Sequence, residues 1–217
     1  MEIDIPLFVL IGAIVATSMI GFSNPQFVDK HIFNTSAIYH ANQWDRLITS
    51  SFLHADGLHL FINMYVLYMF APLLIHTPGL GYLFFFMIYF GAVIVGGLLS
   101  YFMNRHNLRY TALGASGGVT GVVMAFTVIR PDAQLGIIFV PLYIPGYIFG
   151  FLYLTYSIYA MHANRDNIGH DAHLGGAIFG LFIPIAMYPQ LLVQNFFKIA
   201  LLLLPMAYLG YYLYQRR

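Results

Sequence analysis

The chain alternates long apolar stretches with short polar connections. Since the hydrocarbon core of a bilayer is about 30 Å thick, a helix needs roughly 20 apolar residues to cross it. Stretches of this kind predict seven transmembrane helices, over residues 5–22, 57–75, 80–103, 112–129, 136–160, 171–188 and 196–214. Six of them form a predicted core, and only a short connection separates the seventh from the sixth. We therefore expect an all-α, polytopic membrane protein.

The longest connection, about residues 22–56, is unlike a solvated linker. Its polar residues are mixed with Phe22, Phe27, Ile32, Phe33, Ile38 and Trp44. Aromatic side chains are favoured where a bilayer meets water, and interrupted apolar segments can lie in that plane. We expect this segment to lie in the membrane interface.

The composition indicates that lipid is the main solvent of the chain. Hydrophobic residues make up 60% of the 217 and charged residues only 8%, so the mean hydropathy is +0.76. Because no long polar stretch suggests a second unit, we expect one domain over residues 1–217.

The few cations are spread among the loops and predict no nucleic-acid partner. The absence of cysteine excludes a thiol nucleophile. Nothing in the sequence indicates the oligomeric state.

The first residues bear on the membrane in which the chain works. Glu2 and Asp4 stand where a secretory signal carries Lys or Arg, and no small-residue cleavage site follows. We therefore expect the first span to be retained. A mitochondrial presequence is basic and poor in acids, unlike this start. Together with short tails, this favours a bacterial inner membrane.

Two predicted spans carry small residues at every fourth position, which lets another helix backbone come very close. These positions are, on the fourth span, Gly117, Gly121 and Ala125 and, on the sixth, Gly176 and Gly180. Ser116 directly precedes the first set, and His173 lies about one turn before the second. Close packing of the two spans would bring Ser116 and His173 together.

Ser116 and His173 are the residues that this packing offers for chemistry. A lone serine in a transmembrane helix more often bonds back to its own helix than attacks a substrate. A histidine at membrane depth is costly, however, and a neutral imidazole beside a hydroxyl can accept its proton. We predict a Ser-His dyad without an acid. Asp171, two residues from His173, points to another face and is expected to serve as a charge at the helix N-terminus.

His59 and Asn63 are candidates for stabilising a reaction intermediate. A serine protease needs hydrogen-bond donors aimed at the tetrahedral oxyanion. The two residues are four apart on the second span, so they share one face and both can donate into a cavity. The alternative is that they bond each other or a neighbouring helix as structural polar contacts.

These residues stand in the order found in a known family. Gly114-Ala115-Ser116-Gly117 resembles the GxSG motif of the rhomboid family, and Ala172-His173-Leu174-Gly175 resembles its sixth-helix histidine motif. The further matches are Trp44 and Arg46 in the first loop, His54, His59 and Asn63 at the second span, and Gly180. Order and spacing agree over about residues 43–180.

The resemblance implies a six-helix core with an added seventh helix, and a water-filled cavity open to the extracytoplasmic side. It implies an intramembrane serine endopeptidase whose partners are transmembrane protein substrates and the lipid bilayer, without cofactor or metal. Ser116 would attack and His173 would accept and return the proton. Asn63 and His59 would join a backbone amide near Ser116 in the oxyanion hole. Structural support is implied for His54, Trp44 and Arg46.

Two features depart from the family. Thr120 stands one turn after Ser116, where related sequences often carry an aromatic residue against the catalytic histidine, so other aromatic side chains are expected to orient His173. The family orientation also places outside the cations Lys30, Arg46, Arg105, Arg109, Arg165, Arg216 and Arg217. Cytoplasmic loops are usually the basic ones. We keep the family orientation for the six core helices, because the cationic loops belong to the folded core.

The route of a substrate to the site gives two hypotheses. Pro141, Pro145, Gly146 and Gly150 weaken backbone hydrogen bonding in the fifth span and indicate either a deformable gate or an ordinary kink. The polar loop over residues 161–170, just before His173, is a candidate cap over the cavity.

Two other functions fit parts of the sequence. Nine histidines, including the pairs His54 with His59 and His170 with His173, allow a metal-binding membrane protein. No span core supplies an acidic ligand, however, and no HExxH motif occurs. A rhomboid-like protein that binds membrane clients without cutting them would keep the scaffold alone. The presence of all four candidate catalytic residues argues against this alternative.

Overall fold

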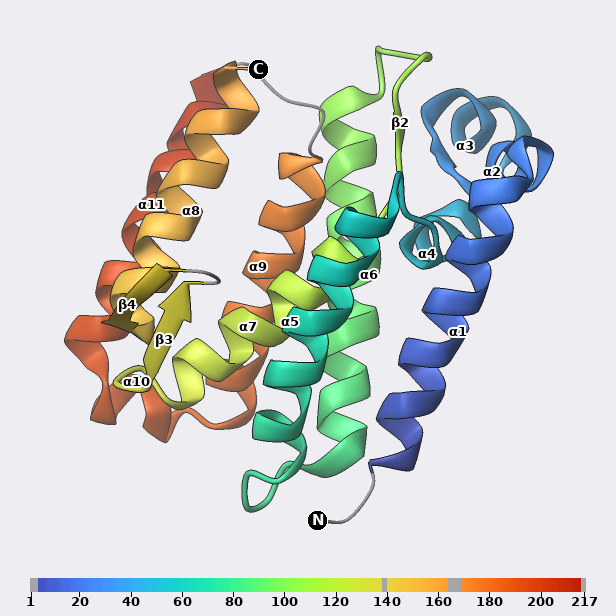
Figure 1. The fold of residues 1–217 in the computed structure, drawn as a ribbon. Coiled ribbons are helices and arrows are strands. Elements are labelled where there is room, and N and C mark those ends of the chain that lie inside the picture. Colours follow the sequence, from blue (N-terminus) through green and yellow to red (C-terminus); the bar gives the residue numbers. More distant parts are fainter. Residues whose placement is uncertain (1–3, 138–139, 164–168, 216–217) are drawn as a thin grey trace.

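The computed structural model describes residues 4–137, 140–163 and 169–215. Its long helices are α1 (Ile5–Ser23), α5 (Gly57–Ile75), α6 (Gly81–Asn104), α7 (Ser116–Ile129), α8 (Gly146–Ala163), α9 (His170–Met187) and α11 (Phe196–Gln215). The shorter elements are α2 (Pro25–His31), β1 (Phe33–Asn34), α3 (Thr35–Ala41), α4 (Arg46–Thr49), the 3-10 helix η1 (Ser50–Phe52), β2 (Thr111–Ala112), β3 (Gln134–Ile137), β4 (Val140–Pro145) and α10 (Gln190–Gln194). Each of the seven predicted spans contains one long helix, so the predicted all-α, polytopic fold is confirmed (Figure 1).

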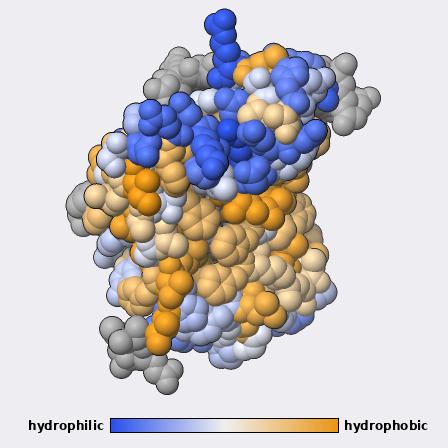
Figure 2. Space-filling model, turned by 90° about the vertical axis from the view of Figure 1, so that its right-hand side faces the viewer, coloured by the Kyte–Doolittle hydropathy of each residue, from blue (hydrophilic) through white to orange (hydrophobic). Residues whose placement is uncertain are grey.

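On the face seen in Figure 2, apolar surface forms a broad band, and hydrophilic residues gather at the end that carries α2 and α3 (Figures 1 and 2). Within the described residues, α1, α5 and α6 are long and apolar enough to cross a membrane. The apolar stretches of α7 (Ser116–Ile129) and of α11 (Phe196–Leu209) are shorter. Large apolar side chains such as Leu83 and Phe197 are exposed on this surface, as expected for side chains that face lipid.

The fourth span begins later than its apolar pattern predicts. Thr111 and Ala112 form β2, which pairs antiparallel with β1 of the 22–56 connection. Gly114 has a φ of +130°, a conformation outside the α region that side chains other than glycine rarely adopt. The helix α7 therefore begins at Ser116, and this serine stands at its N-terminal end rather than inside it.

The fifth span is also shorter than predicted. The strands β3 (Gln134–Ile137) and β4 (Val140–Pro145) pair antiparallel, and α8 begins at Gly146. Proline has no amide donor and disfavours helical conformation in the residue before it, so Pro141 and Pro145 prevent an earlier start. The expected weakening of the helix by these prolines is wrong, because both precede α8. Gly150 does lie within it.

Glycines bring α9 into backbone contact with α7. A Cβ built on Gly176 would lie 2.1 Å from the carbonyl oxygen of Gly117. One built on Gly180 would lie 2.1 Å from the carbonyl oxygen of Gly121. Any side chain would therefore force the two helices apart. The small-residue faces predicted from the sequence are confirmed, and α9 has its most extensive contacts with α6 and α7.

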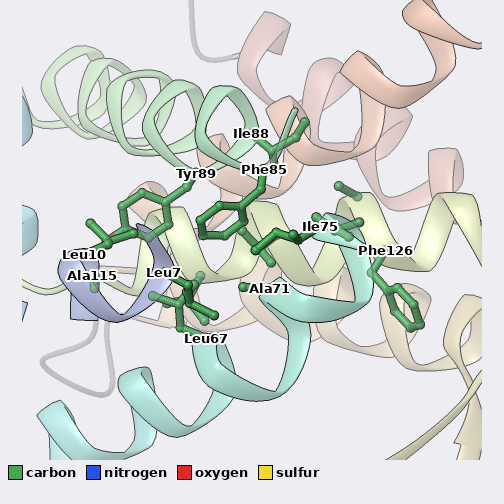
Figure 3. Close-up of a cluster of buried hydrophobic side chains, with 14 of the residues drawn as sticks. Leu7, Leu10, Leu67, Ala71, Ile75, Phe85, Ile88, Tyr89, Ala115 and Phe126 are labelled. Atoms are coloured by element: carbon green, nitrogen blue, oxygen red, sulfur yellow. The ribbon is translucent and has the colours of Figure 1, made fainter. Parts of the chain in front are cut away.

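A cluster of larger side chains joins α1, α5, α6 and α7 (Figure 3). The residues labelled there are Leu7, Leu10, Leu67, Ala71, Ile75, Phe85, Ile88, Tyr89, Ala115 and Phe126. In lipid, helices gain little from the hydrophobic effect, so close packing and dispersion contacts hold such a cluster together. The cluster supports α7, and Phe179 and Ile183 of α9 also pack against it.

The seventh helix packs on α8. In Figure 1, α8 and α11 lie beside each other, on the opposite side of the molecule from α1. The buried side chains that connect them to α7 and α9 are Met124, Val128, Leu154, Ile158, Leu174, Ala177, Leu181, Ile199, Leu202 and Leu209. The added helix thus extends the side of the fold formed by α8.

The 22–56 connection is folded onto the core. Arg46 is buried, and its guanidinium donates hydrogen bonds to the carbonyl oxygens of Asp29 (2.8 Å) and Ile32 (2.6 Å). Trp44 contacts the ring of Tyr101 on α6, with ring centroids 5.1 Å apart. These two contacts fix the segment at the hydrophilic end of the molecule, where the predicted membrane interface would lie.

Candidate active site

Ser116 and His173 face each other where α7 and α9 begin. His173 Nε2 lies 2.5 Å from Ser116 Oγ, which is hydrogen-bond distance. Both side chains are partly exposed. The backbone contact between the glycine faces of the two helices produces this approach. The pair predicted from the sequence is therefore brought together.

Asp171 is directed away from this pair, as its position two residues from His173 predicts. Its carboxylate accepts hydrogen bonds from Asn104 Nδ2 (2.5 Å) and from the Tyr110 hydroxyl (3.0 Å). Burial, and then the nearby Asp171 carboxylate, raise the pKa of Tyr110, so its hydroxyl remains a donor. Asp171 lies in the first turn of α9, where a negative charge is favourable, and it also anchors that turn to the end of α6.

His59 and Asn63 approach the same place from α5. Asn63 is buried and donates from Nδ2 to the main-chain carbonyl of His59 at 2.9 Å. This uses one of the two amide hydrogens of Asn63. A Cβ built on Gly114 would lie 3.0 Å from His59 Nε2 and 3.7 Å from Ser116 Oγ, so both atoms border the same small space. The side chains of His59 and Asn63 therefore lie next to Ser116. The Asn63 amide is also hydrogen-bonded to the main chain of His59.

A cavity of about 210 Å³ opens beside Ser116, between α5, α7 and α8. Its lining residues are Ile62, Asn63, Val66, Ser116, Val119, Thr120, Val123, Met124, Phe149 and Tyr153. Most of this wall is apolar. A second cavity of about 50 Å³ also touches Ser116, and its wall includes Ser50, Ser51 and Ser100. The second volume is large enough to hold a water molecule.

Two contacts of aromatic side chains near the site were not predicted from the sequence. The hydroxyl of Thr120 is 2.9 Å from that of Tyr153, which joins α7 to α8. The ring of His170 lies edge-on to His173, with centroids 5.9 Å apart. The sequence predicts that other aromatic side chains orient His173, and the structure adds this imidazole to its neighbours. The spacing of three residues between His170 and His173 on one helix was the signal that could have predicted the contact.

Some sequence hypotheses are not addressed by the described residues. The candidate cap over residues 161–170 falls on a range in which 164–168 lie outside the described part. Within the part of the chain that the structure describes, no three His, Asp or Glu side chains are grouped so that they could hold a metal ion.

Comparison with known proteins places this geometry in a family. The model of the Rhomboid domain matches residues 41–190. The human presenilin-associated rhomboid-like protein, mitochondrial, is 32% identical over 142 residues, which cover 63% of this chain and 36% of that protein. The mitochondrial RHOMBOID-like protein 12 of Arabidopsis thaliana is 26% identical over 190 residues, covering 78% of this chain and 55% of the relative. The putative rhomboid protease YdcA of Bacillus subtilis (strain 168) is 35% identical over 96 residues, covering 43% and 46%.

The chain spans less than two thirds of the length of these curated relatives. The matched segment begins just before α4 and ends at the start of α10, so it contains the second to sixth predicted spans with all four candidate residues. It covers more than half of the chain. The chain therefore belongs to the rhomboid family.

Proposed function

We propose that the chain is an intramembrane serine endopeptidase that cuts transmembrane segments of other proteins, and that residues 1–217 act as one domain. The observation that carries the proposal is the 2.5 Å contact between Ser116 Oγ and His173 Nε2. Membership of the rhomboid family supports it, since that family consists generally of such proteases. The name of the Bacillus subtilis relative, a putative rhomboid protease, points the same way.

The proposed reaction begins with proton transfer from Ser116 to His173. As Oγ attacks the scissile carbonyl carbon, neutral His173 accepts the hydroxyl proton at Nε2. The carbonyl oxygen becomes negative and is stabilised by hydrogen-bond donors near Ser116. In this proposal the remaining amide hydrogen of Asn63 and the ring of His59 donate there, together with a backbone amide near Ser116.

The second half of the reaction returns the proton. His173 gives it to the leaving amine, the C–N bond breaks and an acyl-enzyme on Ser116 remains. A water molecule then loses a proton to His173 and attacks the ester, which releases the new carboxyl end and restores the Ser116 hydroxyl. The small cavity bordered by Ser50, Ser51 and Ser100 is a suitable place for that water.

The larger cavity indicates what a substrate presents. Its wall between α5 and α8 is mostly apolar, so it suits an apolar side chain next to the scissile bond. A helix that is itself in the membrane must approach from the lipid. We propose that it arrives between α5 and α8, whose Ile62 and Phe149 line the cavity.

The fold is that of an integral, multi-pass membrane protein. The expected bacterial inner membrane is not supported by the comparisons, because the relatives include mitochondrial proteins of animals and plants. We propose that the dyad opens toward the hydrophilic end that carries α2 and α3, and that this end is extracytoplasmic.

Cleavage of a single-span reporter by purified protein in proteoliposomes tests the proposal. The native chain is expected to cut in the presence of a chelator, and Ser116→Ala and His173→Ala are expected to lose cleavage by factors of about 10³ or more. Thr17→Ala, which removes an exposed hydroxyl on α1, serves as a matched control. A folded native chain that binds reporters without cutting them would instead identify a client-binding protein. Cleavage that persists in Ser116→Ala would reject the nucleophile.

A further inference from the structure

His54 lies between α1 and the residues that precede α7. It is 4% exposed, and its Nδ1 lies 2.8 Å from the hydroxyl oxygen of Ser18. Its Nε2 accepts a hydrogen bond from the amide of Ala115 at 3.3 Å. Ser18 is fully buried and donates its own hydrogen to the carbonyl of Phe52 at 2.9 Å. A chain of hydrogen bonds thus runs from α1 to the residue before Ser116.

The number of hydrogens determines the state of this ring. A serine hydroxyl has one hydrogen to donate. Since Ser18 donates it to Phe52, its oxygen can only accept from His54, and Nδ1 must carry a proton. The Ala115 amide is a donor, so Nε2 must carry none. Only the neutral tautomer of His54 with hydrogen on Nδ1 satisfies every group.

The surroundings of His54 favour this neutral state. Burial, and then the neighbouring His59, lower the pKa of His54 to about 4, although Asp56 acts in the opposite direction. The ring of His59 lies edge-on to that of His54, with centroids 4.9 Å apart. A charged ring would have no acceptor at Nε2, because the group facing it is the donor Ala115 N–H.

The segment before Ser116 has a second attachment to the same region. The amide of Gly114 donates to the carbonyl of Ser50 at 3.0 Å. Residues 50–54 therefore hold two successive amides, those of Gly114 and Ala115. Gly114 has a positive φ, and a glycine in such a conformation has many alternatives when it is not held. The two hydrogen bonds select the one conformation that points Ser116 toward His173.

We propose that Ser18 and His54 are positioning residues for the nucleophile. Ser18 holds the His54 ring in the Nδ1–H tautomer, His54 holds the Ala115 amide, and Ala115 fixes where Ser116 begins α7. The inference rests on the proposed function of Ser116. It also extends the active site to α1, which lies outside the residues 41–190 matched by the family model.

The tautomer can be measured without any variant. In detergent-solubilised protein labelled with ¹⁵N-histidine, the two ring nitrogens have chemical shifts that distinguish N–H from a bare nitrogen. We expect His54 to be neutral at pH 7 with hydrogen on Nδ1, both in the native chain and in Ser116→Ala. A hydrogen on Nε2, or a charged ring, would overturn the proposal, because Ala115 could not then donate to it.

Removal of the Ser18 hydroxyl tests the positioning role. In Ser18→Ala, we expect the Ala115 amide to exchange with solvent about tenfold faster and kcat to fall about tenfold, the factor expected for one net hydrogen bond, while KM is unchanged. In Thr17→Ala both quantities should match the native chain, since the Thr17 hydroxyl bonds within its own helix and is exposed. Unchanged exchange and kcat in folded Ser18→Ala would reject the role.

The measurements separate this inference from the proposed function. If the native chain cuts nothing, the proposed function fails, and the His54 tautomer and Ala115 exchange still decide whether the hydrogen-bond chain holds the segment. If the native chain cuts and Ser18→Ala cuts equally well with normal KM, only the positioning role fails. The thermal unfolding of each variant shows that it is folded.

Discussion

The centre of the molecule and its α8–α11 side are packed in different ways. In the centre, α7 and α9 touch through their backbones at Gly117, Gly121, Gly176 and Gly180. On the other side, a Cβ on Gly150 of α8 would meet only the side chains around it. A backbone cannot yield, whereas a side chain can change rotamer. The proposed catalytic pair therefore stands on the rigid part of the fold, and the cavity beside it has one adaptable wall.

The largest expected effect follows from adding one methyl group to the centre. Gly176→Ala should lower the free energy of unfolding by about 3 kcal/mol or more, because its Cβ would lie against the Gly117 carbonyl oxygen. Cleavage should fall as the dyad separates. Thermal unfolding in detergent measures the first effect and the reporter assay the second.

Two matched glycines serve as controls for that change. Gly12→Ala, on α1, places its Cβ in open space and should not destabilise. Gly150→Ala meets Leu202 at 2.7 Å, at the end of a flexible side chain, and should cost less than Gly176→Ala. Equal losses at positions 150 and 176 would remove the contrast between the two regions.

A second expected effect is a loss of stability in acid. Because the pKa of His54 is lowered to about 4 in the folded chain, the unfolded chain binds a proton there first as pH falls. Stability from this group is complete above about pH 6.5 and is lost as pH falls toward 4, by up to about 3 kcal/mol. Denaturant unfolding between pH 7 and pH 4 measures it.

The contribution of His54 to that acid loss can be isolated with two variants. His54→Gln should show a smaller loss of stability between pH 7 and pH 4 than the native chain. His40→Gln, which changes an exposed histidine of α3, should keep the full loss. The same pH dependence in both variants would show that other groups cause it.

The smallest effect is expected on the α8 side. Thr120→Val removes the hydroxyl that bonds Tyr153 and should lower the free energy of unfolding by about 1 kcal/mol. Because α8 is then less firmly joined to α7, kcat/KM for a membrane reporter should rise. Thr155→Val is the control, since its exposed hydroxyl bonds only to Phe151 of the same helix. A fall in kcat/KM would mean that the pair shapes the cavity and does not restrain α8.

Much of the centre could be predicted because its signals are periodic. Small residues four apart describe a helix face directly, and so the meeting of Ser116 with His173 followed from the sequence. The direction of Asp171 followed equally from helix geometry. The contact of His54 with Ala115 joins residues 61 apart in the chain, and no local pattern encodes such a distance.

The start of α8 could not be predicted from hydropathy. A β-hairpin of apolar residues and an apolar helix have the same composition, and only Pro141 and Pro145 marked the difference. The apolar pattern places those prolines inside a helix, as a deformable gate or an ordinary kink, because the segment is long enough to cross a bilayer. The partner strand β3, which decides the matter, contributes to the same apolar run.

The length of α7 bears on how deep within the membrane the proposed reaction takes place. Its 14 residues extend about 21 Å at 1.5 Å per residue, whereas the 19 residues of α5 extend about 28 Å and match the hydrocarbon core. If α7 stands along the membrane normal with its C-terminal end at the far interface, Ser116 lies about 9 Å inside the membrane. A thicker bilayer would lengthen the path of water to Ser116 and leave the distance to His173 unchanged. For the proposed protease, we therefore expect lipid chain length to control hydrolysis through the hydration of Ser116.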